Sequence, residues 1–578
     1  MYSAYVRPMK AALKISLVLL LCLAVLAALF GVPAPLRRTA HAAGEMKPFP
    51  QQVTYSGIIK PNHVSQSSLN ASVTAYYDYW KSAYLKNDLS SLPGGYYVKG
   101  EITGSPDGFI PLGSSEGQGY GMVITALMAG YDPNAKTIFD GLFKTARAYR
   151  SSANPNLMGW VVADNINAQG HFGSATDGDL DIAYSLILAD RQWGSGGAVN
   201  YVAEARKMIT DGIKASYVTT NNRLNLGDWD SKSALNTRPS DWMLSHLRAF
   251  YDFTGDQTWL NVINNLYTVY SAFSSTYSPS TGLISDFVVG DPPQPAPEWY
   301  LDEFKETNEY NYNASRVPLR IVLDYALYGD SRGKTITDKI AGWIKGATGG
   351  NPANVKDGYQ LNGTASGAYA TAVFVSPFVA AGTSNTVNQA WVNAGWDWMK
   401  DKKESYFSDS YNLLTMLFMS GNWWKPVPGG GTAPGTNLVT NPGFESGLTG
   451  WSEWHGAALA QRVEWGGQHS GNYKLVHHHN TAAYTQLTSQ VKAVPNGTYK
   501  LSVWFRSTGG QNALRLFAKN FGGPGELQAN VGAAAVSNWT RYDIDNINVT
   551  NGSIEFGVWS DANANNWAAI DDFILIKK

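Results

Sequence analysis

Cysteine is almost absent from this chain of 578 residues, which holds only Cys22. Cys22 lies in an apolar run near the N-terminus, so the rest of the chain has no thiol for a disulfide or a cysteine-ligated metal. An excess of positive charge is also lacking, because 44 basic residues face 45 acidic ones. A chain without a basic excess lacks the electrostatic footprint of a nucleic-acid-binding protein, so we expect no nucleic-acid partner.

The N-terminus has the pattern of a leader sequence. Three basic residues precede an apolar run over 15–32, and small residues at 40–42 are typical of a cleavage site. Residues 1–42 are therefore predicted to be the signal peptide of a secreted, extracellular protein. They hold five of the 44 basic residues and none of the 45 acidic ones, so the mature chain would carry 39 against 45, a net charge near −6. We expect no membrane anchor after cleavage, no cofactor for catalysis and a monomer.

The mature chain is too long for one hydrophobic core, and a run rich in Pro and Gly over 426–436 marks a linker. Before this linker apolar residues recur with helical spacing; after it they alternate in short runs separated by Gly and Asn. The sequence predicts an all-α domain over 43–425, built of α-hairpins compatible with a toroidal barrel, and an all-β sandwich over 437–578. The expected helices cover 68–86, 116–130, 134–149, 178–191, 200–217, 238–254, 256–273, 313–328, 333–346, 367–382, 386–401 and 408–420.

Two segments place acidic residues at the start of apolar helical runs, 111–122 with Glu116 among glycines and 175–184 with three aspartates. Ser115 and Gln118 have the spacing of a capping box, so we expect Ser115 to cap a helix that begins at Glu116. Thr176 or Asp177 is expected to cap the second helix. Each glycine inside the first helix costs about 1 kcal/mol relative to alanine, so close helix packing or a ligand must require the bare backbone.

A ring of paired inner and outer helices would bring Glu116 and Asp177 into one cleft, because the inner helices would begin at the same rim. Two carboxyl groups in one cleft suit glycoside hydrolysis, in which a protonated group acts as acid and an ionised group activates water or attacks carbon. The start of a helix lowers the pKa of Glu116, so burial and the charge of Asp177 must outweigh this effect. The alternative is that these acidic residues merely occupy helix starts.

Three segments of the chain resemble glycoside hydrolase family 8, the endoglucanases, lichenases and chitosanases built on an (α/α)6 barrel. They are Ser-Glu-Gly-Gln-Gly-Tyr-Gly-Met at 115–122, Ala-Thr-Asp-Gly-Asp-Leu-Asp-Ile-Ala at 175–183 and Asn-Ala-Ser-Arg-Val-Pro at 313–318. The resemblance covers roughly 60–425. It implies that Glu116 is the general acid, that Asp177 binds and distorts the sugar at the cleavage point, and that the reaction inverts the anomeric centre.

One position departs from the pattern of that family. In many of its endoglucanases the counterpart of Asn313 is an aspartate that serves as the base, and an amide cannot accept the proton of water. The segment 297–306 resembles a loop of the chitosanase-type subfamily, whose base is a glutamate in this loop. We therefore assign the base to Glu303. The alternatives in the same loop are Glu298, Asp302, Glu306 and Glu309.

Aromatic residues make up 13% of the chain, with 20 Trp and 32 Tyr, which exceeds what a core of this size needs. Sugar rings stack on exposed aromatic faces, so we expect some of these residues to line the cleft. The residues expected to contact the substrate lie in loops or at helix starts: Tyr120, Trp160, Trp229, Tyr312, Asn313, Arg316 and Phe407. The alternative for the aromatic residues is a place in the core. Arg316 is also expected to position a carboxylate or the nearby loop, and the alternative for it is a structural ion pair.

The segment 437–578 resembles the galactose-binding-like jelly rolls that serve as carbohydrate-binding modules, through its opening at 437–445 and its closing at 567–573. By that resemblance Glu445 and Asp572 are expected to hold a structural calcium ion. The histidines at 477–479 are expected to be partly exposed strand residues rather than metal ligands, because neighbours in a strand point to opposite faces. The tryptophans considered for sugar stacking, of which two or more must fill the core, are Trp451, Trp454, Trp504 and Trp559.

The sequence therefore predicts a secreted, endo-acting glycosidase with a polysaccharide substrate. We expect it to cleave β-1,4 linkages of chitosan, whose amines suit the acidic loop at 298–309, and of β-1,4- or mixed-linkage glucan, by an inverting single displacement. The alternatives are an endoglucanase or lichenase without chitosanase activity, and a non-catalytic polysaccharide-binding protein.

Overall fold

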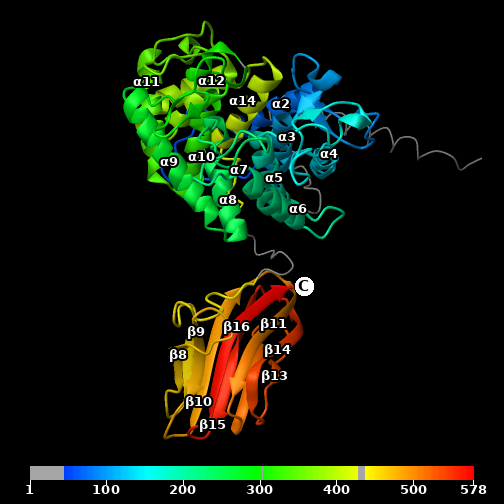
Figure 1. Cartoon of the computed structure of the whole chain (residues 1–578), viewed down its shortest axis with the longest axis vertical. Helices are drawn as coiled ribbons and strands as arrows, with labels where there is room; N and C mark the ends of the chain where they lie inside the picture. The colour runs from blue at the N-terminus through cyan, green and yellow to red at the C-terminus, as the bar shows by residue number, and fades with distance from the viewer. Residues whose placement is uncertain (1–44, 303, 427–436) are drawn as a thin grey trace, which may run out of the picture. The chain divides into compact units, whose positions relative to one another are not determined.

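The computed structural model describes residues 45–302, 304–426 and 437–578. The expected signal peptide, Cys22, Glu303 and nearly all of the expected linker lie outside the described residues. None of the described helices combines the length and the apolar character that a membrane span needs. Figure 1 shows a helical part up to α14 (Tyr406–Met419) and a β part from β7 (Ser452–His455) onward, and each is described by itself.

The helical part is built around a ring of six inner helices (Figure 1). These are α3 (Ser115–Met128), α5 (Thr176–Trp193), α8 (Leu244–Thr254), α10 (Val317–Tyr328), α12 (Ala372–Gly382) and α14 (Tyr406–Met419). Each packs against the next, and α14 closes the ring against α3. Every residue of α12 is buried. A helix that is apolar on all sides is stable only where it is covered on all sides, as it is in the wall of a barrel.

The outer helices each pack against an inner helix and bury one stripe of side chains. They are α2 (Gln66–Tyr84), α4 (Ala135–Ala148), α6 (Tyr201–Lys207), α9 (Thr258–Tyr277), α11 (Ser331–Ala347) and α13 (Gln389–Met399). Helix α6 continues through a π-helical turn, Met208–Lys214, into α7 (Ala215–Tyr217). The predicted (α/α)6 barrel is thereby confirmed.

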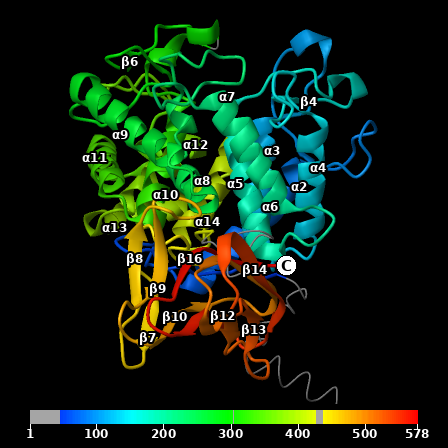
Figure 2. The same cartoon turned by 60° about the horizontal axis from the view of Figure 1, so that its bottom comes forward.

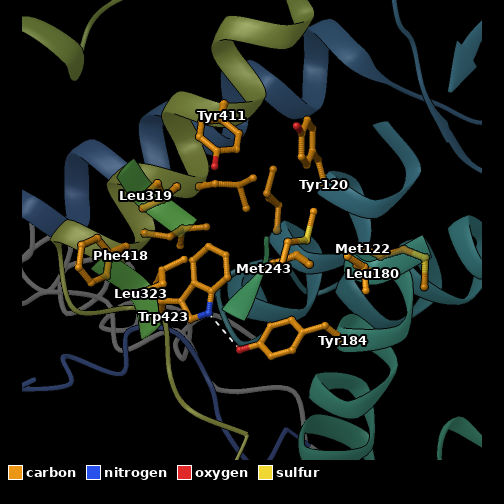
Figure 3. Packing of buried hydrophobic residues seen from close by; sticks show 14 of the residues in the cluster. Tyr120, Met122, Leu180, Tyr184, Met243, Leu319, Leu323, Tyr411, Phe418 and Trp423 are labelled. Carbon is orange, nitrogen blue, oxygen red and sulfur yellow. Dashed lines mark hydrogen bonds between the residues drawn. The ribbon is translucent and has the colours of Figure 1, made fainter. Parts of the chain in front are cut away.

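The barrel interior is filled by side chains from several inner helices (Figure 3). Trp423, beyond the last helix, is also buried there and donates a hydrogen bond to the Tyr184 hydroxyl over 3.1 Å. Trp424 is buried as well, so the chain belongs to the barrel core at least to this point. Figure 3 labels Tyr120, Met122, Leu180, Tyr184, Met243, Leu319, Leu323, Tyr411, Phe418 and Trp423.

Three inner helices begin later than the sequence predicts. Helix α8 begins at residue 244 rather than 238, α10 at 317 rather than 313, and α12 at 372 rather than 367. Before α10, the Asp286 carboxylate accepts hydrogen bonds from the backbone amides of Asn313 (3.0 Å) and Ala314 (2.7 Å). These amides need no helical partner, so the chain can enter α10 through a 3-10 turn, Ala314–Arg316.

The predicted helix caps are wrong at both acidic motifs. Ser114 caps α3, because its hydroxyl accepts a hydrogen bond from the Gly117 amide, while the Gln118 side chain donates to backbone carbonyls of Tyr96 and Leu142. The residue that precedes α5 is Ala175, which makes no side-chain cap. At the first motif Gln118 binds the backbone of Tyr96 and Leu142 instead of the helix start, and the buried Ser115 hydroxyl has no hydrogen-bond partner among the described residues.

The β part is a sandwich of two five-stranded antiparallel sheets, which confirms the predicted all-β fold of this part. The first sheet has the order β13-β12-β15-β10-β7, and the second has the order β14-β11-β16-β9-β8. Figure 2 labels strands of both sheets. The strands are β7 (Ser452–His455), β8 (Gln461–Trp465), β9 (Tyr473–His478), β10 (Tyr484–Ala493), β11 (Gly497–Ser507), β12 (Gln511–Lys519), β13 (Leu527–Asn530), β14 (Val536–Val549), β15 (Ser553–Ala562) and β16 (Trp567–Lys577).

Two sequence expectations about the sandwich interior are resolved by burial. Trp451 is 9% exposed and packs against Phe444 and Phe573, so it belongs to the core. His477 is fully buried between the sheets, within hydrogen-bond distance of Ser560 and Thr488. The expectation that it is partly exposed is wrong, and burial lowers the pKa of His477 to about 3, which keeps the ring neutral.

Candidate active site

The starts of α3 and α5 meet backbone to backbone. A Cβ on Gly178 would lie 2.4 Å from the Ser115 carbonyl carbon, and a Cβ on Gly119 would lie 2.9 Å from the Gly178 oxygen. The glycines of these motifs are therefore required for close helix packing, one of the two explanations that the sequence left open. Glu116 and Asp177, each the second residue of its helix, are brought side by side by this contact.

Glu116 lies at the surface of an otherwise buried helix. Every residue of α3 is buried except Glu116, whose side chain is 22% exposed. Its Oε2 accepts a hydrogen bond from Arg316 Nη1 over 2.7 Å, and its Oε1 accepts one from the Tyr406 hydroxyl over 2.8 Å. Both carboxyl oxygens are thus oriented by protein donors.

Arg316 connects the two acidic motifs from a fully covered position. The same Nη1 that contacts Glu116 lies 3.0 Å from Asp177 Oδ2. Nη2 donates to the Ser240 hydroxyl and to the Asn313 amide oxygen, each over 3.0 Å. Arg316 is only 2% exposed, so it positions the carboxyl groups of Glu116 and Asp177 from inside the barrel and does not present its own charge to a ligand.

A second arginine holds the other side of Asp177. Arg238 Nη2 lies 3.3 Å from Asp177 Oδ1, and Arg238 Nε lies 3.1 Å from the buried carboxylate of Asp241. Acidic and basic groups therefore alternate along a chain of contacts in the order Glu116, Arg316, Asp177, Arg238 and Asp241.

These neighbours push the two carboxyl groups toward opposite protonation states. Burial raises the pKa of Glu116, and the charge of Asp177 adds to this effect against the opposing influence of Arg316 and the Tyr406 hydrogen bond. Burial also acts to raise the pKa of Asp177, but Arg238, Arg316 and the Gly178 amide outweigh it and hold that pKa at about 2. Glu116 is thus suited to carry a proton beside an ionised Asp177.

The other aspartates of the second motif have structural partners. Asp179 accepts hydrogen bonds from the Met158 amide and the Tyr217 hydroxyl, and burial raises its pKa to about 8. Asp181 contacts His246 at 2.7 Å and Arg320 at 3.0 Å. Only the first of the three aspartates reaches the site.

Asn313, which replaces the expected aspartate, is 8% exposed. Its side-chain oxygen accepts from Arg316 and its backbone amide donates to Asp286. Its amide thus orients the central arginine.

The loop that carries residue 303 is anchored on both sides of that residue. The buried Thr307 hydroxyl donates to the Pro297 carbonyl over 2.8 Å and accepts from the Tyr300 amide over 3.1 Å. Tyr300 packs in a small cluster with Leu226, whose carbonyl accepts from the Thr176 amide next to Asp177. Glu303 itself lies outside the described residues, so its role as base stays a prediction.

The alternative bases of this loop differ in exposure. Glu298 is exposed, whereas Glu306 and Glu309 are half-buried. The side chain of Asp302 is not among those described.

The aromatic residues predicted to contact substrate fall into two groups. Tyr120 is fully buried against Tyr411, so the expectation that its ring meets a sugar is wrong. Trp229 is 57% exposed, and its indole lies 3.4 Å from where a Cβ on Gly173 would be, shortly before the start of α5. The half-buried members of the set are Trp160, Tyr312 and Phe407, and the Phe407 ring lies 5.4 Å from the Arg316 guanidinium carbon.

Sequence reasoning missed three side chains of this site, namely Tyr406, Arg238 and Asp241. Tyr406 is the first residue of α14, and the other two lie just before α8. These residues lie at or near the starts of two other predicted helices, 238–254 and 408–420, so the expectation that inner helices begin at one rim points to them as well.

The two carboxylates expected to bind calcium in the sandwich have protein donors instead. Glu445 Oε1 accepts from the amides of Asn472 and Tyr473, and Asp572 contacts His469 and Ser470. Among the described residues no group of three or more His, Cys, Asp or Glu side chains is arranged to hold a metal ion. The expectation that Glu445 and Asp572 hold a structural calcium ion stays an untested prediction.

Comparison with known proteins identifies the helical domain. The sequence model of glycosyl hydrolases family 8 matches residues 52–421. An endoglucanase from Bacillus sp. (strain KSM-330) is 74% identical over 391 residues, 68% of this chain and 84% of that protein. A beta-glucanase of Niallia circulans is 46% identical over 389 residues, 66% of this chain and 92% of that protein.

A solved structure agrees with these sequence matches. The apo structure of a beta-1,3-1,4-glucanase from Paenibacillus sp. X4 is 46% identical, with a TM-score of 0.62 over 66% of this chain and 100% of that one. These matches cover the helical domain that contains the glycine contact and the paired carboxyl groups. The chain therefore belongs to glycosyl hydrolases family 8.

Proposed function

We propose that this protein is a secreted endo-β-glucanase that cleaves internal β-1,4 bonds in cellulose-type or mixed-linkage β-glucan. The observation that carries the proposal is the pairing of a partly exposed Glu116, whose pKa is raised, with an ionised Asp177 held by two arginines. The substrate class is supported by the relatives, which are named endoglucanase, beta-glucanase and beta-1,3-1,4-glucanase.

In the proposed reaction Glu116 gives its proton to the leaving glycosidic oxygen. The carboxylate that forms then lies 2.7 Å from Arg316 Nη1 and 2.8 Å from the Tyr406 hydroxyl. These donors are already in place before the proton moves, so the developing negative charge needs little reorganisation. Asp177, which stays ionised, is assigned the binding and distortion of the sugar at the cleavage point.

The second half of the proposed reaction is the attack of a water molecule activated by Glu303. An inverting enzyme needs about 6.5–9.5 Å between acid and base, to leave room for that water. The assignment of the base to this loop is supported by the described residues on both sides of residue 303. Thr307 anchors them, and Tyr300 packs with Leu226, whose carbonyl accepts from the Thr176 amide.

Replacement of the acid tests the proposed function directly. Glu116→Gln keeps the size of the side chain and an acceptor for Arg316 but removes the proton, so turnover on mixed-linkage β-glucan is expected to fall at least ~10²-fold. Release of reducing sugar measures it, with substrate binding as the control for an intact cleft. Hydrolysis at the wild-type rate would refute the assignment.

Stereochemistry tests the base. Proton NMR of fresh digests should show an inverted anomer. Glu303→Gln should abolish hydrolysis, whereas Asn313→Ala should only weaken it. Glu298→Gln, in the same loop, is the control and should leave hydrolysis unchanged. A retained anomer would mean a double displacement and would overturn this mechanism.

Chitosan is a second candidate substrate. It is favoured by the acidic residues of the loop, of which Glu298 is exposed and Glu306 and Glu309 are half-buried. Parallel assays on chitosan, carboxymethylcellulose and lichenan separate the two candidates. Activity on lichenan or carboxymethylcellulose without activity on chitosan would exclude chitosan as a substrate.

A further inference from the structure

One face of the sandwich carries a row of aligned side chains that the barrel chemistry does not use. In the sheet β13-β12-β15-β10-β7, Leu487 of β10 lies opposite Trp454 of β7 on one side and Trp559 of β15 on the other. Arg515 of β12 lies opposite Trp559. Residues directly opposite each other in neighbouring strands point to the same face, so these four side chains form one row across the sheet.

This row lies on the outer face. Val558 and Leu514, which precede Trp559 and Arg515 in their strands, belong to the sandwich core. Side chains alternate along a strand, so Trp559 and Arg515 point away from that core.

The two indole rings hold each other in a fixed orientation. The centroids of Trp454 and Trp559 are 5.7 Å apart, and their planes differ by 18°. The Arg515 guanidinium carbon lies 5.6 Å from the Trp559 ring, and Glu526 accepts from Arg515 Nε at 3.3 Å. The Trp559 ring is therefore contacted by Trp454 and by Arg515, whereas the Trp454 side chain is 52% exposed to solvent. The result is a flat apolar surface whose orientation is set before any ligand arrives.

Polar groups lie beside this surface on the same face. Thr485 and Asp561 are paired in register, two residues along the strands from Leu487 and Trp559. The Asn512 amide donates to Asp561 Oδ1 over 2.8 Å. A hydroxyl and a carboxylate next to an aromatic ring match a sugar, whose C–H face stacks on the ring while its hydroxyls form hydrogen bonds. The ion pair of Arg515 with Glu526 leaves little net charge at the row, which suits a neutral chain.

We propose that this outer face binds a β-glucan chain, with Trp454 as the stacking residue and with Trp559 and Arg515 as the residues that hold its ring in place. The choice of glucan rests on the proposed function of the barrel. All residues of this proposed site belong to strands of the sandwich.

The other tryptophans considered for sugar stacking are less suited to this role. Trp451 is in the core, and Trp504 stacks on His469 at 4.6 Å with the Arg541 guanidinium carbon 5.2 Å from its ring. Trp465 in the other sheet is 77% exposed, and among the described residues no aromatic ring stacks on its indole. Trp465 is thus a matched control for the loss of an exposed indole.

The test measures binding of the full chain to mixed-linkage β-glucan in a native affinity gel. All proteins carry Glu116→Gln, so that hydrolysis does not alter the polymer. Trp454→Ala is expected to weaken retention about tenfold, Trp454→Phe to restore most of it, and Trp465→Ala to bind like the parent. Unfolding temperatures equal to that of the parent show that each variant is folded.

The outcomes separate this proposal from that for the barrel. Retention of Trp454→Ala equal to the parent overturns the proposed site, as does an equal loss in Trp465→Ala or a parent that does not bind β-glucan. Failure of the wild-type chain to release reducing sugar from β-glucan instead refutes the proposed activity, and the binding assay still gives its own result.

Discussion

At the scale of single residues, the environment decides what a carboxyl group does. Asp177, Asp179 and Asp181 belong to one short motif and are all buried. Two arginines hold the pKa of Asp177 at about 2, whereas burial with neutral partners raises the pKa of Asp179 to about 8. Aspartate thus supplies an ionised group at the site, Asp177, and a group that readily holds a proton inside the barrel wall, Asp179.

The pKa of Glu116 should move in opposite directions when its two neighbours are changed. The charge of Asp177 raises this pKa and the Tyr406 hydrogen bond lowers it. Activity needs protonated Glu116, so it is lost as pH rises through its pKa. Asp177→Asn should therefore move the alkaline limb of kcat to lower pH, and Tyr406→Phe should move it to higher pH.

The measurement is kcat against pH on soluble β-glucan. Tyr131→Phe, which removes a hydroxyl bonded to Asp78 at the surface, is the control and should leave the limb in place. Shifts of the same sign in both site variants would contradict the assigned role of Glu116.

At the scale of secondary-structure elements, the site depends on how closely two helix starts approach each other. The bare backbone of Gly178 faces the Ser115 carbonyl carbon, and backbone atoms cannot rotate away as a flexible side chain can. The distance between Glu116 and Asp177 is therefore set by the packing of α3 on α5.

Gly178→Ala should destabilise the barrel by about 1–3 kcal/mol or more, because its Cβ would lie 2.4 Å from backbone. It should also lower kcat by pushing the two carboxyl groups apart. Denaturant unfolding and turnover are the measurements.

Gly342 in α11 is the matched control, since a Cβ there would meet nothing within 4 Å. Gly342→Ala should raise stability by about 0.5–1 kcal/mol, as expected for alanine in a helix. A Gly178→Ala variant as stable and active as the wild type would refute the role of the close contact.

At the scale of the whole molecule, two hydrophobic cores share no residue. One core comprises barrel side chains as far as Trp424, and the other begins at Val439. Each part therefore has the buried apolar surface that an independently folding domain requires.

A chain that ends at Pro428 keeps the whole barrel core, including Trp423 and Trp424. It should remain soluble and hydrolyse short soluble oligomers at close to the wild-type rate. Activity on insoluble glucan should fall further, because the sandwich would no longer raise the local concentration of enzyme at the polymer. Assays of both substrates check this, and an equal loss on both would place the sandwich in the catalytic cleft.

Much of the architecture was determined by local sequence. Helical spacing and strand alternation identify the barrel and the sandwich, because burial of one face repeats with the period of each element. Glu116 and Asp177 could be named from two short motifs, since their glycines and acids stand at predicted helix starts.

Only the tertiary structure decided which side chains surround those two residues. Arg316 is 200 residues from Glu116 in sequence and Tyr406 is 290 residues away, yet both bind its carboxyl group. Local periodicity carries no information on such pairs, so Arg238 and Asp241 were missed and Tyr120 was placed in the cleft although it is buried. The sequence by itself determined the elements and the acidic motifs, whereas the protonation states depend on charges that meet only when the ring of helices closes.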